Sequence, residues 1–330
     1  MLQLEKGAAK TEESLFEPAT NSYSSAKSSA ASASAKHTEN RYAFNLEFRG
    51  YHWKVQQQPA NHGEIMAALQ KARADELTDE EAKDIICGIA KAENDLVIST
   101  MVLPEVLKSG RFLSKSSPYC LVPGASWLTE IPLERLVWSK GGISPPEPDM
   151  SMGLRPDAAP ESGVLVCKYM GPYFTPIICA PRLWCPFFTI ETEIRQNGIS
   201  PFIRNVHNAA VMMRNLRRIH QDAGDNIEDD FDGKAHVLTL IFARNHIELS
   251  CHWSRKKSDL KVEYFVNRLM FWSTSLMVAE AKQMVTYIRN AMDWVREHNR
   301  ECLEDAIEKL EKKIEAGEAV LDDVVDDEQD

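Results

Sequence analysis

Two carboxylates and a guanidinium alternate along residues 186–195, PFFTIETEIR. The aromatic and β-branched content predicts a strand, in which alternate side chains share a face. Glu191, Glu193 and Arg195 then lie on one face, and the other face is apolar. Same-face carboxylates about 7 Å apart repel each other unless a positive charge lies between them. Arg195 or a divalent metal ion could supply that charge, whereas the simplest alternative is a solvated sheet face with a Glu–Arg pair.

A further carboxylate, Asp149, starts a second predicted strand over residues 149–154, directly after the proline-rich segment SPPEP. The order Pro-Asp, then Glu191-x-Glu193, then an amphipathic helix resembles the PD-(D/E)XK nuclease superfamily. The physical basis of that motif is hard-metal binding, because Mg²⁺ prefers carboxylate, water and phosphate oxygens. Carboxylates on two adjacent strands can hold such an ion against a scissile phosphate, and a nearby lysine stabilises the charge that develops on phosphorus.

Five sequence blocks narrow the resemblance to the fungal PD-(D/E)XK nuclease-like domain family, and together they cover roughly residues 80–300. In chain order the blocks read PEPDMSMGL, LWCPFFTIETE, RNVHNAAVMMRNLRRI, HVLTLIFARNHIELSCHW and IRNAMDWVREH. The resemblance implies a mixed α/β (α+β) fold with a restriction-endonuclease-like core, in which helices flank a central mixed sheet. It also implies that Asp149 and Glu191 bind Mg²⁺ or Mn²⁺, and that the substrate is DNA or RNA.

The chain departs from the family pattern at Glu193, which stands where the motif has lysine. Arg195, or Lys168 on a candidate strand over residues 164–169, could replace the missing cation. In an active enzyme Glu193 would be a further metal ligand or the group that deprotonates water. The alternative is a catalytically inactive module on the same fold that binds nucleic acid or protein. An unrelated α/β scaffold is a third interpretation.

Superfamily members often add an acid from the helix before the sheet. Here Thr78 and Glu81 form a capping-box pattern that starts such a helix, and Pro104 is expected to end or kink it. Glu93 lies at the edge of the apolar stripe and Asp95 on the solvent side, so helical geometry favours Glu93 as the outer metal ligand. The simplest alternative is that both acids are surface charges.

Arginines on the helix predicted over residues 203–220 offer phosphate contacts. Arg214 and Arg218 are four residues apart and therefore share a face. A solvated helix face explains the same pattern. His246 and His252 lack the further ligands of a zinc site, and we interpret them as structural.

The remaining pattern predicts one nuclease-like domain over residues 41–300, between two terminal extensions. Residues 1–40 form a Ser/Ala-rich arm that is expected to be disordered. Residues 301–330 combine helical spacing with an acidic tail. Residues 111–148 are predicted to be irregular. The elements after residue 220 are predicted as a hairpin of strands 237–243 and 247–253, strand 262–271 and helix 277–298.

The overall charge does not exclude a polyanionic substrate. The formal net charge is −11, but residues 301–330 hold 13 acids and 3 lysines, so the rest of the chain is nearly neutral. Seven scattered cysteines without a CxxC pair indicate a reduced, intracellular protein. No apolar run is long enough to span a membrane, so we expect a soluble protein, in the nucleus or the cytoplasm.

Overall fold

A computed structural model describes residues 40, 42–47, 50–53, 57–107, 117, 119–124, 127, 146–156, 161–174, 183–193, 199–258 and 261–318. Residues 1–39 of the predicted arm, Arg195 and the last twelve residues of the acidic tail lie outside these ranges.

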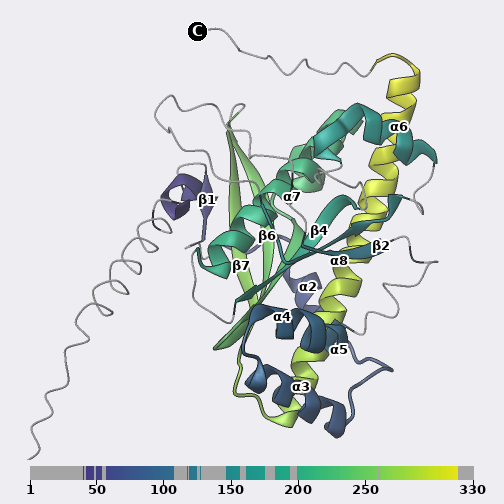
Figure 1. Ribbon diagram of the computed structural model, residues 1–330. Coiled ribbons are helices and arrows are strands. Elements are labelled where there is room, and N and C mark those ends of the chain that lie inside the picture. The colour runs from purple at the N-terminus through teal and green to yellow at the C-terminus, as the bar shows by residue number, and fades with distance from the viewer. Residues whose placement is uncertain are drawn as a thin grey trace, which may run out of the picture.

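A seven-stranded mixed sheet with the order β1-β7-β6-β5-β4-β3-β2 forms the centre of the protein (Figure 1). The pairs β4/β5 and β1/β7 are parallel, and the other neighbours are antiparallel. The strands are β1 (Tyr51–His52), β2 (Tyr119–Pro123), β3 (Met150–Leu154), β4 (Trp184–Glu193), β5 (Ala235–Ala243), β6 (His246–Ser258) and β7 (Lys261–Ser273). The mixed α/β class predicted from the sequence is therefore confirmed.

Two long helices cover opposite faces of the sheet (Figure 1). Helix α7 (Pro201–Ala223) packs on the face that carries Glu191. Helix α8 (Val278–Glu315) packs on the other face, where His298 meets His236 of β5. The shorter helical segments are α2 (His62–Leu69), α3 (Asp79–Lys91), α4 (Asp95–Val97), η1 (Ile98–Val102), α5 (Leu103–Leu107), α6 (Glu161–Met170), η3 (Gly171–Tyr173) and η4 (Ile227–Phe231).

The central strands are buried on both faces. All nine residues of β5 and the first nine of β4 are buried. This double burial explains why the sequence AHVLTLIFA of β5 is almost continuously apolar rather than alternating. Large aromatic side chains contribute to this core, including the buried Trp184, Trp253, Trp272 and Trp294.

The predicted strand over residues 164–169 is wrong, because these residues belong to helix α6. A short apolar run has no period that separates a strand from a buried helix, and only two of its six residues are β-branched. Residues 111–148, predicted to be irregular, contain strand β2, which pairs with β3 along its whole length.

The first long helix breaks earlier than predicted. The capping box of Thr78 and Glu81 is present, but α3 ends at Lys91 and the chain becomes extended at Ala92. Pro104 does not end a helix, since it is the second residue of α5, directly after the π-helical turn η1. A wider turn before the proline accommodates its missing N–H. Within the described part of the chain, no helix is both long and apolar enough to cross a membrane.

Candidate functional site

The two acids of the predicted metal site lie at the same end of two adjacent strands. In the antiparallel pair β3/β4, Met150 is opposite Ile190, so Asp149 lies beside the end of β4 that carries Glu191 and Thr192. Asp149 precedes the first residue of β3. Its Oδ2 accepts hydrogen bonds from the Thr192 backbone N–H (2.6 Å) and from Thr192 Oγ1 (2.9 Å). These two bonds fix the Asp149 carboxylate at the edge of β4.

Glu191 is completely buried beneath α7. Asn208 Nδ2 of α7 donates a hydrogen bond of 2.6 Å to Glu191 Oε1. Arg204 Nε lies 3.2 Å from Oε2, but without hydrogen-bond geometry. Among the described residues, neither Glu191 Oε2 nor Arg204 Nε has a hydrogen-bond partner. A solvated sheet face is therefore wrong for this position, since Glu191 sits in a closed layer between sheet and helix.

The surroundings of Glu191 favour its neutral form. Burial raises the pKa of Glu191 to about 8, and the charges of Asp149 and Glu193 act in the same direction. The Arg204 guanidinium and the Asn208 hydrogen bond oppose that rise in pKa. At pH 7, with no further cation, the Glu191 carboxyl is mostly protonated.

A layer of polar side chains surrounds Glu191 between β3, β4 and α7. Thr189 Oγ1 donates to Asn205 Oδ1 (3.3 Å), and Asn205 Nδ2 donates to the Leu240 carbonyl (3.0 Å). Ser151, opposite Thr189, is buried, and its Oγ has no hydrogen-bond partner among the described residues. The sequence patterns do not predict this layer. Its one signal is two asparagines, Asn205 and Asn208, three residues apart among the apolar residues of an amphipathic helix.

The donor types at this site fit a hard divalent cation. Among the described residues, the buried Oε2 of Glu191 has an ion-pair contact with Arg204 but no hydrogen-bond donor, and the Asp149 carboxylate is close enough to raise the Glu191 pKa. Across the described ranges, no three His, Cys, Asp or Glu side chains are grouped so as to hold a metal ion. A cation here would therefore take its remaining ligands from water and substrate oxygens, as Mg²⁺ commonly does.

Several predicted site residues do not join the acid pair. Glu193 is the last residue of β4 and is half-buried. Glu93 lies in the break between α3 and α4, and Asp95 is the first residue of α4, so the helical argument that favoured Glu93 is wrong. Glu93 does not complete a three-residue metal group with Asp149 and Glu191. Lys168 lies on helix α6 rather than on a neighbouring strand.

The predicted phosphate contacts lie further along α7. Arg214 is ten residues beyond Arg204, which corresponds to about 15 Å along the helix axis. Arg214 and Arg218 both approach the ring of Tyr173 rather than Glu191.

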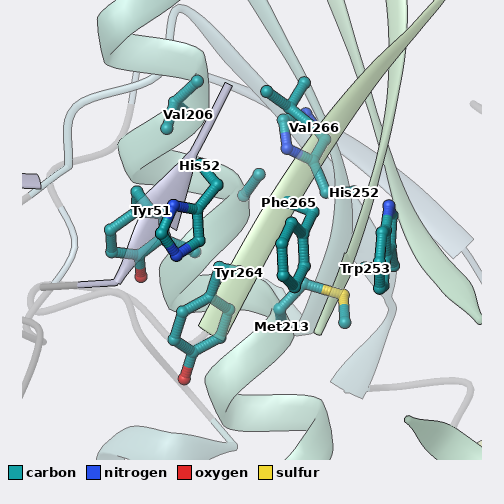
Figure 2. Close-up of a pocket in the computed structure, with 11 residues that line it drawn as sticks. Tyr51, His52, Val206, Met213, His252, Trp253, Tyr264, Phe265 and Val266 are labelled. Atoms are coloured by element: carbon teal, nitrogen blue, oxygen red, sulfur yellow. The ribbon is translucent and has the colours of Figure 1, made fainter. Parts of the chain in front are cut away.

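A small cavity between β1, β6, β7 and α7 contains none of the predicted acids (Figure 2). Its volume of ≈ 10 Å³ suffices for about one water molecule, and most of its lining is apolar. His252, which borders the cavity, is buried and shares a hydrogen bond of 2.9 Å with Thr239 Oγ1. Burial lowers the pKa of His252 to about 3. His252 is therefore a neutral core residue, in line with its predicted structural role.

The chain belongs to a family described as a domain of unknown function, DUF7924, whose model matches residues 98–307. The matched segment includes Asp149, Glu191 and all of α7. A comparison with curated proteins finds no significant match.

Proposed function

We propose that this chain is a PD-(D/E)XK nuclease-like protein in which Asp149 and Glu191 hold Mg²⁺ or Mn²⁺ for hydrolysis of phosphodiester bonds in nucleic acid. The observation that carries the proposal is the β3/β4 pairing, which brings Asp149 to the end of β4 next to Glu191. Among the described residues, the buried Oε2 of Glu191 has no hydrogen-bond donor. The element order supports a restriction-endonuclease-like core: α3, then the antiparallel strands β2, β3 and β4, then α7, then β5 parallel to β4.

The residues around the acid pair have distinct roles in this proposal. Thr192 holds the Asp149 carboxylate, and Asn208 orients that of Glu191. A bound divalent ion would polarise the scissile phosphate and activate water. Arg204, on the helix that follows β4, brings a positive charge to within 3.2 Å of Glu191, although Glu193 occupies the lysine position of the motif.

A second candidate is a catalytically inactive module of the same fold that binds nucleic acid or protein. The specific observation in its favour is that Glu191 is 0% exposed and already lies against Arg204. In this version the guanidinium takes the place of the metal, and the acid is retained as part of the polar layer under α7.

Calorimetric titration with Mn²⁺ tests the metal site. We expect wild-type protein to bind Mn²⁺, and Glu191→Gln and Asp149→Asn to bind at least about tenfold more weakly, since each loses a charged ligand. Both substitutions keep the shape and an oxygen acceptor for Asn208 or Thr192. The control is Glu297→Gln, which removes an exposed carboxylate on α8. Equal binding by all four proteins would support the inactive module.

Cleavage assays on Glu193→Lys separate the active and inactive versions. A lysine at position 193 restores the cation of the motif next to the developing phosphorane charge. If wild type is inert and Glu193→Lys cleaves with Mg²⁺, the protein is an inactive module that retains the metal pair. If wild type cleaves and a folded Glu193→Lys does not, Glu193 is itself a ligand or base. If neither protein cleaves single- or double-stranded DNA or RNA, the nuclease proposal fails.

A further inference from the structure

A half-exposed aromatic ring lies on the same face of the sheet as Glu191. Phe271 of β7 is 50% exposed, although the next residue, Trp272, is buried. In register, Phe271 is opposite Glu248 of β6, which is opposite Ile241 of β5. Ile241 is in turn opposite Glu191 of β4. Residues opposite each other in a ladder share a face, so Phe271 and Glu191 both point to the face that carries α7.

The distance between this ring and the acid pair suits a polymer. Neighbouring strands lie about 4.8 Å apart, so the three steps from β7 to β4 amount to about 14 Å. A nucleic-acid strand carries one phosphate per about 3.4 Å of helix axis, and roughly four stacked nucleotides therefore span this distance. One strand can thus contact Phe271 and reach Glu191 at the same time.

Planar groups pack against the Phe271 ring and hold it in place. His246 of β6 stacks on it, with 5.2 Å between the ring centroids and 14° between the planes. The guanidinium carbon of Arg268 lies 4.9 Å from the Phe271 centroid, and Arg268 Nη2 lies 2.7 Å from Glu248 Oε2. His246 Nδ1 shares a hydrogen bond of 2.8 Å with Asn245 Oδ1. These contacts restrict the side-chain rotamers, so a ligand meets an ordered surface.

Positive charge is more exposed than negative charge beside this ring. The side chain of Arg268 is 56% exposed, whereas that of its counter-ion Glu248 is 2% exposed. The β5/β6 turn adds the exposed Arg244, whose carbonyl accepts a hydrogen bond of 3.0 Å from Thr274 Oγ1, just beyond β7. Burial lowers the pKa of His246 despite the nearby Glu248 carboxylate, so the imidazole is neutral at pH 7. An aromatic surface flanked by arginines is complementary to nucleobases and phosphates.

We propose that His246, Phe271 and Arg268 form a stacking platform for an unpaired base of single-stranded nucleic acid. The inference rests on the proposed function, because the backbone of the same strand would extend across the sheet to the acid pair. It adds the substrate class, since a base inside a duplex is stacked on its neighbours and has no free face. Every base has a π-face, so the platform selects unpaired bases rather than a sequence.

Binding of a short oligothymidylate to the full-length protein in EDTA tests the platform, since no metal is then present to support cleavage. We expect Phe271→Ala and Phe271→Leu to bind at least about tenfold more weakly than wild type, because each loses the stacked ring. Phe271→Trp keeps an aromatic face and should bind at least as tightly as wild type. The control is Val164→Ala, which shortens a side chain of similar exposure (46%) on α6 and should bind like wild type. Circular dichroism checks the fold of each variant.

An abasic oligomer of the same length separates base stacking from phosphate binding. Wild type and Phe271→Ala should bind this oligomer equally. The proposal is overturned if wild type does not bind oligothymidylate, if Phe271→Leu binds as tightly as Phe271→Trp, or if Phe271→Ala weakens both oligomers to the same extent. A changed oligomeric state of Phe271→Ala with unchanged oligothymidylate affinity would overturn it in favour of a protein interface.

Failure of the platform is distinguishable from failure of the metal site. Phe271→Ala should keep the Mn²⁺ affinity of wild type, and Asp149→Asn should keep the difference in EDTA between oligothymidylate and the abasic oligomer. If Mn²⁺ does not bind but oligothymidylate binding depends on Phe271, the platform stands and the chain is the inactive nucleic-acid-binding module. If Mn²⁺ binds as expected and position 271 has no effect on oligothymidylate binding, the metal site stands and the platform is wrong.

Discussion

Glu191 combines two features that oppose each other energetically. It is fully buried, which favours a neutral carboxyl, and it lies within 3.2 Å of a guanidinium, which favours a carboxylate. Burial prevails, and the pKa rises to about 8. Ionisation of the buried Glu191 carboxyl therefore destabilises the folded state, and a bound divalent cation would offset part of that destabilisation.

We expect Glu191→Gln to change the pH dependence of stability. The folded-state pKa of about 8 lies above the unfolded value of 4.5, so between these pH values the unfolded chain releases a proton that the folded chain keeps. The contribution of Glu191 to the free energy of unfolding of the wild-type protein therefore falls as the pH rises from 4.5 to 8. Glu191→Gln has no titrating group at this position. The difference in free energy of unfolding between this variant and wild type should therefore shift in favour of the variant by about 2–4 kcal/mol from pH 5 to pH 8. Urea unfolding in EDTA measures this, with Glu297→Gln as control, and a difference that does not vary with pH would contradict it.

The sequence predicts the acids of the site but not their surroundings. Strand alternation places Glu191 and Glu193 on one face, and the Pro-Asp pattern identifies Asp149. Neither pattern indicates that α7 closes over Glu191, because the contacts from Arg204 and Asn208 depend on the rotation of the helix against the sheet. Glu93 was misplaced for a related reason, since the periodicity continues through a break at Ala92 that only backbone geometry reveals.

Strands β3 and β4 approach each other closely at a bulge, and this approach sets the register of the acid pair. The pairing register shifts between Met152 and Leu154, across Gly153. Cys185 of β4, close to the same bulge, has a positive φ of 44°. A β-bulge with a small residue accommodates such local strain.

A methyl group at position 153 should disturb this register. The Cβ of Gly153→Ala would lie 2.5 Å from the Trp184 carbonyl oxygen and 3.0 Å from Pro186 Cα, both of which are backbone atoms that cannot rotate away. We expect a loss of about 1–3 kcal/mol in the free energy of unfolding. Gly63→Ala is the matched control, because a Cβ there meets nothing within 4 Å, and this exposed position in α2 should gain up to about 1 kcal/mol. Thermal unfolding of both variants tests the pair, and equal effects would show that the bulge tolerates a side chain.

A buried arginine is one of the residues that join helix α8 to the helical N-terminal region. Arg289 is 3% exposed and donates to three carbonyl oxygens, those of Val106 (2.8 Å), Glu105 (2.9 Å) and Asp75 (3.0 Å). Arg289→Met keeps the aliphatic stem but leaves these carbonyls without a donor, and we expect a loss of about 3 kcal/mol. Lys312→Met removes an exposed ion pair with Glu308 on the same helix and should cost less than about 1 kcal/mol. Comparable losses in chemical denaturation would contradict the anchoring role of Arg289.

The elements differ in how well the sequence predicts them. The sequence predicts long amphipathic helices such as α7 and α8, and the β5/β6 hairpin, because the spacing of apolar residues repeats several times along each element. The sequence predicts a strand in place of helix α6 and no regular element at β2. Each is a short apolar segment whose secondary structure depends on the elements that it packs against or pairs with. The order of the strands in the sheet is a long-range property and was not predicted.

At the scale of the whole molecule, α8 packs on the sheet where its half-buried His298 meets the buried His236. Asn299 Nδ2 donates to the His236 carbonyl, and His298 and His236 share a hydrogen bond of 3.0 Å between ring nitrogens. His236 in turn bonds the Phe231 carbonyl. Because His236 Nε2 donates to that carbonyl, His236 Nδ1 accepts from His298 Nε2, and a proton added to His236 Nδ1 would place two donors face to face.

These histidines and Glu191 together predict an optimum in stability near pH 6.5. Burial lowers the pKa of His236, His252 and His298, so below pH 6.5 the unfolded chain takes up protons that the folded chain does not, and stability falls with falling pH. Above pH 6.5 the histidines are neutral in both states, and Glu191 alone makes stability fall as pH rises toward 8. Several histidines act on the acid arm against one carboxyl, so the acid arm should be steeper than the alkaline arm, where Glu191 gives about 1 kcal/mol per pH unit. Urea unfolding at half-unit steps from pH 4.5 to 8.5 measures the curve, and a stability that keeps rising up to pH 8 would show that Glu191 ionises without cost, as it would beside a tightly bound cation.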